Sequence, residues 1–118
     1  MRYNEDLPNL EELHFILWYK LYLQHRTGRE FVTTSEAYEL VANHFGLSEE
    51  QKNHLTEKGY NDWQARVRSS YDHLKGKGII QSDPNRKGYW KLTDKGIETF
   101  EEWFPPVIPS GKQIINNE

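Results

Sequence analysis

A seven-residue segment, SDPNRKG at residues 82–88, constrains the fold of this chain more than any other stretch. Asp, Pro, Asn and Gly favour turns, each for its own conformational reason. Short runs of β-forming residues stand on both sides of the segment, which is typical of two antiparallel strands. The sequence therefore predicts a β-hairpin over residues 79–93. Because side chains alternate along a strand, Tyr89 and Trp90 face opposite sides, and Trp90 is assigned to the core.

The rest of the chain carries helix signals. Polar residues that cap helix N-termini precede apolar stretches with helical spacing, and at several of them Glu or Gln follows three residues later, as in a capping box. The expected N-caps are Asn9, Thr33, Ser48, Asn61 and Thr93. A short β-prone stretch, EFVTT at residues 30–34, leads into the second helix. This order predicts a mainly α fold with a small β-hairpin, an α+β winged helix-turn-helix.

A chain of 118 residues is most simply one compact domain. We expect a winged-helix domain over residues 1–104, because two prolines must end the last helix, and an extended or disordered tail over residues 105–118. The chain has no Cys, no apolar run near the roughly 20 residues of a membrane span, and an acidic N-terminus unlike a secretory signal. These features predict a cytoplasmic protein without membrane contact.

The charge of the chain is unevenly distributed. The net charge is −3, but residues 58–95 hold nine Lys or Arg against four Asp, which gives +5, while the remainder holds six basic and fourteen acidic residues, which gives −8. Local charge, not the total, decides whether a surface attracts phosphate. The basic segment covers the fourth helix and the hairpin, which favours nucleic acid as a partner, although charge blocks also arise by chance on a mixed surface.

In a winged-helix protein, one helix enters the major groove and the hairpin, or wing, contacts the adjacent backbone. The recognition helix is expected at about 62–75 and the wing at about 79–93. Gln and Arg make bidentate contacts with adenine and guanine, and Lys and Arg neutralise phosphates. The predicted contacts with duplex DNA are Gln64, Arg66, Arg68, Ser69, Arg86, Lys87 and Lys91, with Tyr89 as an aromatic contact on sugar. Since any exposed amphipathic helix carries Gln and Arg, the assignment depends on the adjacent basic wing.

The sequence offers little for catalysis. Its five His residues show no HExxH or other ligand spacing, no Cys joins them, and no Gly-rich phosphate loop is present. His14, within an apolar helix, is interpreted as a packed residue. We therefore expect no catalytic site, no metal and no cofactor. A pocket for a flipped or modified base, built from Trp63, Tyr89 or Trp90, is an alternative, but aromatic residues at such positions more often belong to a core.

The segment WQARVRSSYDHLKGKGIIQSDPNRKGYWKLTDKG, residues 63–96, resembles the N-terminal winged-helix domain of Mrr-type restriction endonucleases. That family shows an aromatic residue three positions before an Arg-Val pair, a Leu seven after the Val, a Gly with two aliphatic residues, and a wing ending in Gly-aromatic-Trp-basic-aliphatic-Thr before a later Gly. The matching positions are Trp63, Arg66–Val67, Leu74, Gly78–Ile80, Gly88–Thr93 and Gly96. The resemblance implies a DNA-binding targeting module of a restriction system, which in the family precedes a separate nuclease domain.

The chain departs from the family pattern at two positions of the expected reading surface. Ser69 stands where the family often has Trp, and Asp62 where it often has a basic residue. The preferred DNA sequence and its modification are therefore not implied by the resemblance. No nuclease domain follows the matching segment, so cleavage does not carry over to this chain. We expect either the targeting domain of a longer enzyme, with a nuclease domain or subunit as its partner, or a small stand-alone binder.

Two other functions remain open from the sequence. The aromatic first helix, with Trp18, Tyr19 and Tyr22, is interpreted as core or as a homodimer seam, and a dimerising winged helix can serve as an adaptor that never touches DNA. A small transcriptional repressor uses the same DNA chemistry but requires a dimer that reads two half-sites about one helical turn apart. Oligomeric state together with DNA binding separates these alternatives.

Overall fold

The structure, a computed structural model, describes residues 7–105 as five helices and three short strands. The elements are α2 (Leu10–Arg26), β1 (Val32–Thr33), α3 (Thr34–Phe45), α4 (Glu49–Asn53), α5 (Asp62–Gly76), β2 (Ile80–Ser82), β3 (Tyr89–Leu92) and α6 (Asp94–Trp103). The order confirms the predicted mainly α fold with a β-hairpin. The predicted tail lies outside the described residues from position 106 onward, and the domain boundary at 104 stays a prediction.

Each helix begins at the N-cap that the sequence predicts, because a side-chain oxygen there satisfies a backbone N–H that has no partner within the helix. Asn9, Thr33 and Ser48 form reciprocal boxes with the Glu or Gln three residues later. At α5 only half of the expected pair forms. Asn61 Oδ1 accepts a hydrogen bond from the Gln64 backbone N–H at 2.8 Å, but the Gln64 side chain is exposed and does not return the bond.

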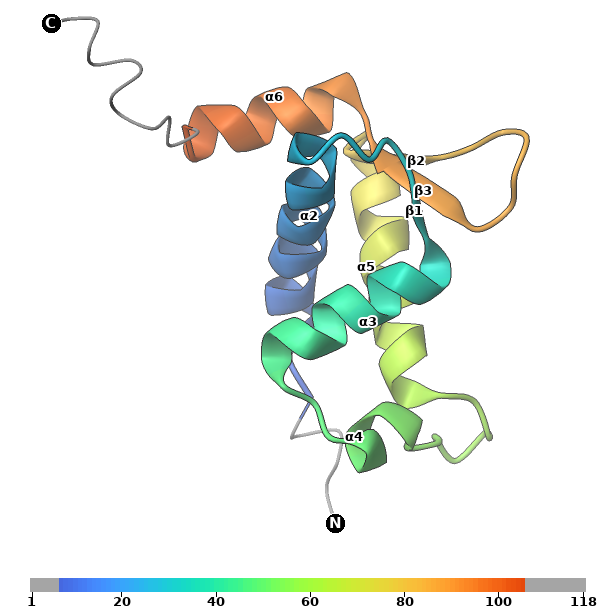
Figure 1. Cartoon of the computed structure of the whole chain (residues 1–118). Coiled ribbons are helices and arrows are strands. Elements are labelled where there is room, and N and C mark those ends of the chain that lie inside the picture. Colours follow the sequence, from blue (N-terminus) through green and yellow to red (C-terminus); the bar gives the residue numbers. More distant parts are fainter. Residues whose placement is uncertain (1–6, 106–118) are drawn as a thin grey trace, which may run out of the picture.

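One hydrophobic core joins the helices to the inner face of the sheet. Figure 1 shows α2 and α5 side by side, with α3 crossing them and α4 at the end opposite to α6. The most deeply buried side chains include Leu13, Leu17, Val32, Val41, Trp63, Val67 and Ile80. Apolar burial of this kind stabilises the fold by about 25 cal/mol per Å². Because the core anchors α5 along one face, the opposite face is held in a fixed orientation toward solvent.

His14 lies at the contact between α2 and α5, as expected for a packed residue. Its ring stacks on that of His73, with centroids 4.1 Å apart and planes 6° from parallel. Its Nδ1 is 2.9 Å from the hydroxyl of Ser70, a buried residue of α5. Burial first, and the neighbouring His73 second, lower the pKa of His14. The neutral ring is therefore favoured at this helix contact.

The three strands form an antiparallel sheet in the order β1–β3–β2. The short strand predicted from EFVTT is confirmed as β1, in which Val32 pairs with Trp90. Side-chain alternation places Trp90 and Leu92 on the core face, where both are buried, and this confirms the assignment of Trp90. Tyr89 and Lys91 lie on the outer face of the sheet.

Helix α6 packs against α2 and closes the core. Trp18 Nε1 donates a hydrogen bond to the backbone oxygen of Gly96 at 3.0 Å, and the ring of Phe100 stacks on that of Tyr22 with centroids 4.5 Å apart. Trp18 and Tyr22 are buried within the chain, which confirms their interpretation as core, whereas a homodimer seam on this helix stays a prediction. Of that seam, Tyr19 alone keeps a partly exposed ring.

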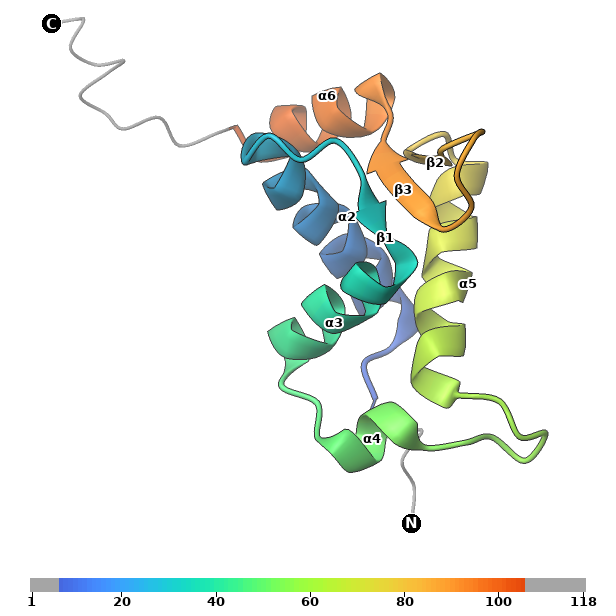
Figure 2. The same ribbon diagram turned by 45° about the vertical axis from the view of Figure 1, so that its right-hand side comes forward.

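Two loops project from the body on the same side of α5. One is the wing tip between β2 and β3, and the other is residues 54–61 between α4 and α5 (Figures 1 and 2). The helical core with its projecting hairpin gives a winged-helix-like α+β fold. Within residues 7–105, no helix has the length and apolar character needed to cross a bilayer.

Candidate nucleic-acid interface

Helix α5 has one buried face and one exposed face. Residues three and four apart share a side of a helix, so Trp63 and Val67, 2% and 1% exposed, both point into the core. Gln64, Arg68 and Ser69 are exposed on the remaining surface. The structure thus brings together the three predicted base and phosphate contacts that lie on the polar face of this helix.

The wing tip is an ordered turn that Asp83 holds together. Its Oδ1 accepts a hydrogen bond from the Asn85 backbone N–H at 2.9 Å, and its Oδ2 accepts one from Arg86 Nε at 2.7 Å. These bonds, that of Asn85 first, lower the pKa of the Asp83 carboxyl. Gly88 ends the turn at a φ of +79°, in the left-handed region that glycine adopts without strain. The turn predicted from SDPNRKG is confirmed.

Two contacts fix the wing against the helices. Tyr71 of α5 and Trp90 of β3 stack with ring centroids 4.1 Å apart and planes 14° from parallel. At the base of the wing, the backbone oxygen of Gly88 accepts hydrogen bonds from the Thr34 N–H at 2.8 Å and from the Thr34 hydroxyl at 3.2 Å. The wing is therefore tied both to α5 and to the first residue of α3.

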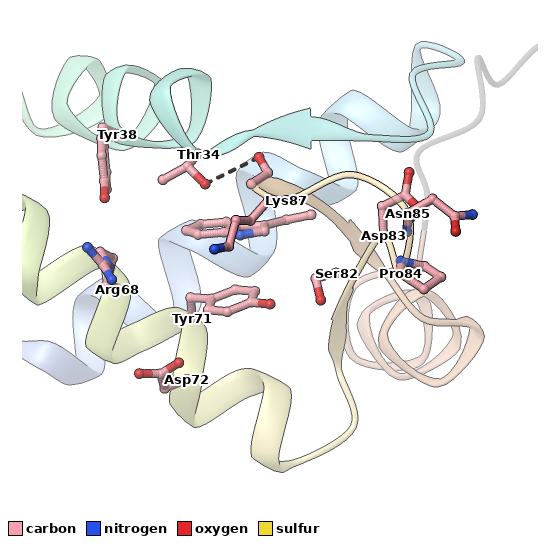
Figure 3. Close-up of a pocket in the computed structure, with 12 residues that line it drawn as sticks. Thr34, Tyr38, Arg68, Tyr71, Asp72, Ser82, Asp83, Pro84, Asn85 and Lys87 are labelled. Carbon is pink, nitrogen blue, oxygen red and sulfur yellow. Dashed lines mark hydrogen bonds between the residues drawn. The ribbon is translucent and has the colours of Figure 1, made fainter.

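An open pocket of about 750 Å³ lies between α5 and the wing (Figure 3). Arg68 lines it from α5, with Tyr38 of α3 beside it, and Lys87 points into it from the wing. Tyr71 contributes to its inner surface. Two of the predicted cationic contacts, which come from different elements, thus line one concave surface. Asp72 and Asp83 line the same hollow, so its two cations stand beside two carboxylates.

A second hollow, of about 340 Å³, continues this surface toward the N-terminal end of α5. The residues that line it include Tyr60, Gln64, Arg68, Ser69 and Asp72. Arg68 and Asp72 line both hollows, so the polar face of α5 forms one continuous surface. We call this surface, from Tyr60 to Lys87, the α5 groove.

Arg86 does not line either hollow and lies instead over the outer face of the sheet. Its guanidinium stands 4.0 Å from the ring centroid of Tyr89 and 5.0 Å from that of Phe31. It also pairs with Asp83 across the 2.7 Å bond, which raises the pKa of Arg86. Its charge is thus matched within the wing, and the predicted aromatic contact Tyr89 is covered in part by the same guanidinium. Such cation–π contacts favour a guanidinium placed over the ring faces.

Lys91 lies in the same region. Its Nζ donates to Glu30 Oε2 at 2.9 Å and stands 5.3 Å from the centroid of the Phe31 ring. The segment before β1 therefore supplies both the carboxylate and the ring that hold this lysine. Lys91 supports the outer face of the sheet rather than the α5 groove.

Arg66 points toward the N-terminal segment. Its Nη1 donates to the backbone oxygen of Pro8 at 3.1 Å, and its Nε lies 3.4 Å from Asp62 Oδ1. Asp62 is buried, and a nearby cation offsets part of the cost of burying its charge. Of the seven predicted polar contacts, the structure gathers Gln64, Arg68, Ser69 and Lys87 in the α5 groove and places Arg66, Arg86 and Lys91 elsewhere.

The groove also contains residues that the sequence did not single out. Tyr38 reaches it from α3, and burial raises the pKa of Tyr38 although the nearby Arg68 acts in the opposite direction. No local pattern marks Tyr38, because its partner lies on a different helix. Asp72 brings a negative charge into both hollows, which opposes phosphate. Its place on the polar face of α5 was the only sequence signal for it.

Other site types find no support in the described residues. Trp63 and Trp90 are 2% and 4% exposed and belong to the core, although an edge of Trp90 also lines the hollow between α5 and the wing. The alternative base pocket built from Trp63, Tyr89 or Trp90 stays a prediction. Residues 7–105 contain no group of three or more His, Cys, Asp or Glu side chains arranged to hold a metal ion. The α5 groove is therefore the strongest candidate site.

Comparison with protein-family models matches residues 21–102 to the Mrr N-terminal domain. The match begins within α2 and includes α3, the whole sheet, α5 and nearly all of α6. No curated protein and no solved structure matches the chain. The match covers most of the chain and includes both the helix and the wing that form the groove. The chain therefore belongs to the Mrr N-terminal domain family.

Proposed function

We propose that this chain is a DNA-targeting module of a restriction-type system, which binds duplex DNA with α5 in the major groove and the wing on the adjacent backbone. Membership of the Mrr N-terminal domain family supports the restriction context. The observation that carries DNA binding is the joint lining of one open groove by Arg68 of α5 and Lys87 of the wing.

The exposed residues of α5 have the chemistry to read bases. The major groove is about 12 Å wide and admits a helix. Arg68 pairs bidentately with guanine and Gln64 with adenine, while Ser69 bonds to a phosphate beside them. Gln64 is available for this role because its side chain does not complete the cap of its own helix.

Lys87 neutralises a backbone phosphate beside the helix, because it is exposed and points into the groove. Arg86 and Lys91 have a different role. Their charges are matched by Asp83 and Glu30, so they hold the wing in the shape that presents Lys87. Arg66 likewise acts by fixing the start of α5.

Fluorescence anisotropy of a labelled random duplex across a salt series tests this function. Each neutralised phosphate contributes about −0.9 to the slope of log affinity against log salt. Lys87→Ala should flatten that slope by about one unit and weaken all sequences alike. Lys20→Ala, on α2 and lining neither hollow, removes the same charge and should leave the slope unchanged.

Absence of salt-sensitive binding by the wild-type chain at low salt would overturn the proposed function. A sequence-selective loss on changing Lys87, with the slope intact, would overturn its assignment as a phosphate contact.

A second candidate function, docking of a protein partner such as a nuclease domain or subunit, is favoured by an exposed aromatic cluster. Phe15, Trp103 and Phe104 are 37%, 56% and 48% exposed, and the rings of Phe15 and Phe104 lie 5.5 Å apart. A cluster of exposed aromatic rings is typical of a protein contact. The pair Phe15→Ser/Trp103→Ser should abolish self-association or partner binding in light-scattering measurements and leave DNA binding intact.

A further inference from the structure

The loop that precedes the recognition helix has a defined shape. Its backbone is closed by a bridge between Leu55 and Asn61, and within it the Thr56 N–H donates to Tyr60 O and the Gly59 N–H to Thr56 O, both at 2.8 Å. Gly59 has a φ of +89°, in the left-handed region that glycine adopts without strain. These bonds hold residues 54–61, the entry loop, in one conformation.

The base of the entry loop is joined to the helices on both sides. The Asn61 side-chain amide donates to Lys52 O at 2.8 Å, and the Asp62 N–H donates to His54 O at 3.0 Å. The position of the loop is therefore set by α4 and by the first turn of α5. A partner that contacts the N-terminal part of the exposed face of α5 therefore also lies near this loop.

The entry loop exposes side chains next to the α5 groove. Tyr60 is 54% exposed and lines the same hollow as Gln64 and Ser69. Lys58 and Glu57 are exposed at the tip of the loop. The Tyr60 side chain thus adjoins the predicted contact residues of α5. The charged side chains of Lys58 and Glu57 follow at the tip of the loop.

The length of α5 relates the two projecting loops to one another. At about 1.5 Å per residue, its 15 residues span about 22 Å, which exceeds the roughly 12 Å width of the major groove. The ends of a helix lying across that groove therefore reach the phosphate strands on both sides. The entry loop and the wing stand at opposite ends of α5 and project on the same side (Figures 1 and 2).

We infer that the entry loop is a second DNA-contacting element, in which Lys58 lies at a backbone phosphate and Tyr60 packs on the adjacent sugar, across the major groove from Lys87 of the wing. This inference rests on the proposed function, because it needs α5 to lie in the major groove of the DNA. It adds a contact that the resemblance and the family match do not assign. Glu57 lies near the same phosphate strand and weakens binding.

The test uses the full chain and the same labelled duplex. One variant removes a positive charge from the entry loop and another removes a negative charge, so their expected effects on affinity are opposite. Lys58→Ala should weaken binding by about three- to tenfold and flatten the salt slope by about 0.9, since one phosphate contact is lost. Glu57→Gln should tighten binding by about two- to fivefold, because a carboxylate near phosphate is removed. Tyr60→Ala should weaken binding about threefold or more without changing the slope. Lys20→Ala is the charge-matched control and should change neither quantity.

The outcomes separate the inference from the proposed function. If the wild-type chain binds DNA and Lys58→Ala, Glu57→Gln and Tyr60→Ala all behave like Lys20→Ala, the entry loop lies off the DNA and the inference is wrong, while the proposed function stands. If both charge variants shift affinity in the same direction, the loop acts through folding and the inference is also wrong. Absence of binding by the wild-type chain overturns the proposed function itself.

Discussion

Tyr71 and Trp90 stack face to face across the junction between α5 and the wing, with centroids 4.1 Å apart and planes 14° from parallel. One ring belongs to α5, whose exposed residues are proposed to read bases, and the other to β3, which follows the wing tip. Trp90 is buried, whereas Tyr71 is partly exposed at the inner surface of the groove. The stack therefore sets the distance between the two parts of the proposed DNA-binding surface.

Replacing Tyr71 should weaken both the fold and DNA binding. We expect Tyr71→Leu to lower the free energy of unfolding by about 1 kcal/mol, because aromatic pairs contribute about 0.5–1.5 kcal/mol beyond their buried area. Urea unfolding measures the loss, and a double-mutant cycle with Trp90→Leu isolates the pair. Strictly additive losses in that cycle would show that the two rings do not stabilise each other.

Gly96 should tolerate no side chain. A Cβ at this position would meet the backbone oxygen of Ile79, and the Gly96 oxygen also accepts the hydrogen bond of Trp18. We expect Gly96→Ala to lower the free energy of unfolding by at least about 2 kcal/mol, since the clash is with backbone and α6 must move. Gly76→Ala is the matched control. A Cβ there meets nothing within 4 Å, so this change should be neutral or stabilise by about 0.5–1 kcal/mol. Equal losses for both variants in urea unfolding would contradict this packing.

The ion pair of Glu36 should give stability that is lost in acid. The Arg29 guanidinium first, and the Thr33 N–H second, lower the pKa of Glu36 from 4.5 to about 2. Between these values the unfolded chain binds more protons than the native state. The stabilisation is therefore complete above pH 4.5 and disappears as the pH falls toward 2.

Glu36→Gln tests this pH dependence, because Gln can still complete the capping box with Thr33. Arg29 and Glu36 are 46% and 41% exposed, so solvent screening keeps the expected loss at pH 7 below about 1 kcal/mol. The difference from wild type, measured by urea unfolding at several pH values, should vanish near pH 2. A constant difference from pH 7 to pH 2 would show that the ion pair is not its origin.

Asp72 should oppose DNA binding. It is exposed and lines both hollows of the α5 groove together with Arg68. Asp72→Asn removes a carboxylate from the surface that faces phosphate, and we expect affinity for a duplex to rise about two- to fivefold at low salt. Glu98→Gln, at an exposed residue of α6 that lines neither hollow, should leave the affinity unchanged. An unchanged affinity of Asp72→Asn in anisotropy would mean that this face lies off the DNA.

The sequence predicted the elements well where the signal is local. Thr33 begins α3 because its hydroxyl and the Glu36 carboxylate satisfy backbone N–H groups only three residues away. The turn at Asp83 is equally local, since the carboxylate bonds to residues two and three positions later. Interactions that close within one turn are encoded in adjacent residue types, so pattern reading recovers them.

The functional residues could be sorted only by the tertiary structure. Lys91 pairs with Glu30, 61 residues earlier, and Arg66 bonds to Pro8, 58 residues earlier. Since no local pattern relates such residues, sequence reasoning predicts DNA contacts for Arg66, Arg86 and Lys91 as well as for Arg68 and Lys87. The fold distinguishes Arg68 and Lys87, which face the groove, from the cations that hold the wing and the start of α5.

The most direct test of this account compares two double variants, each of which removes two positive charges. Their binding to one labelled duplex is measured by anisotropy at several salt concentrations. Arg68→Ala/Lys87→Ala removes the groove pair, and Arg86→Gln/Lys91→Gln removes the pair on the outer face of the sheet. The account predicts that the first variant, while folded, weakens binding at least about tenfold and flattens the salt slope by about 1.8. The second variant loosens the wing and lowers the affinity, but it should leave the slope nearly unchanged, because its charges are matched by Asp83 and Glu30. An unchanged slope of the first variant, or a larger flattening for the second, would contradict the α5 groove as the DNA-binding surface.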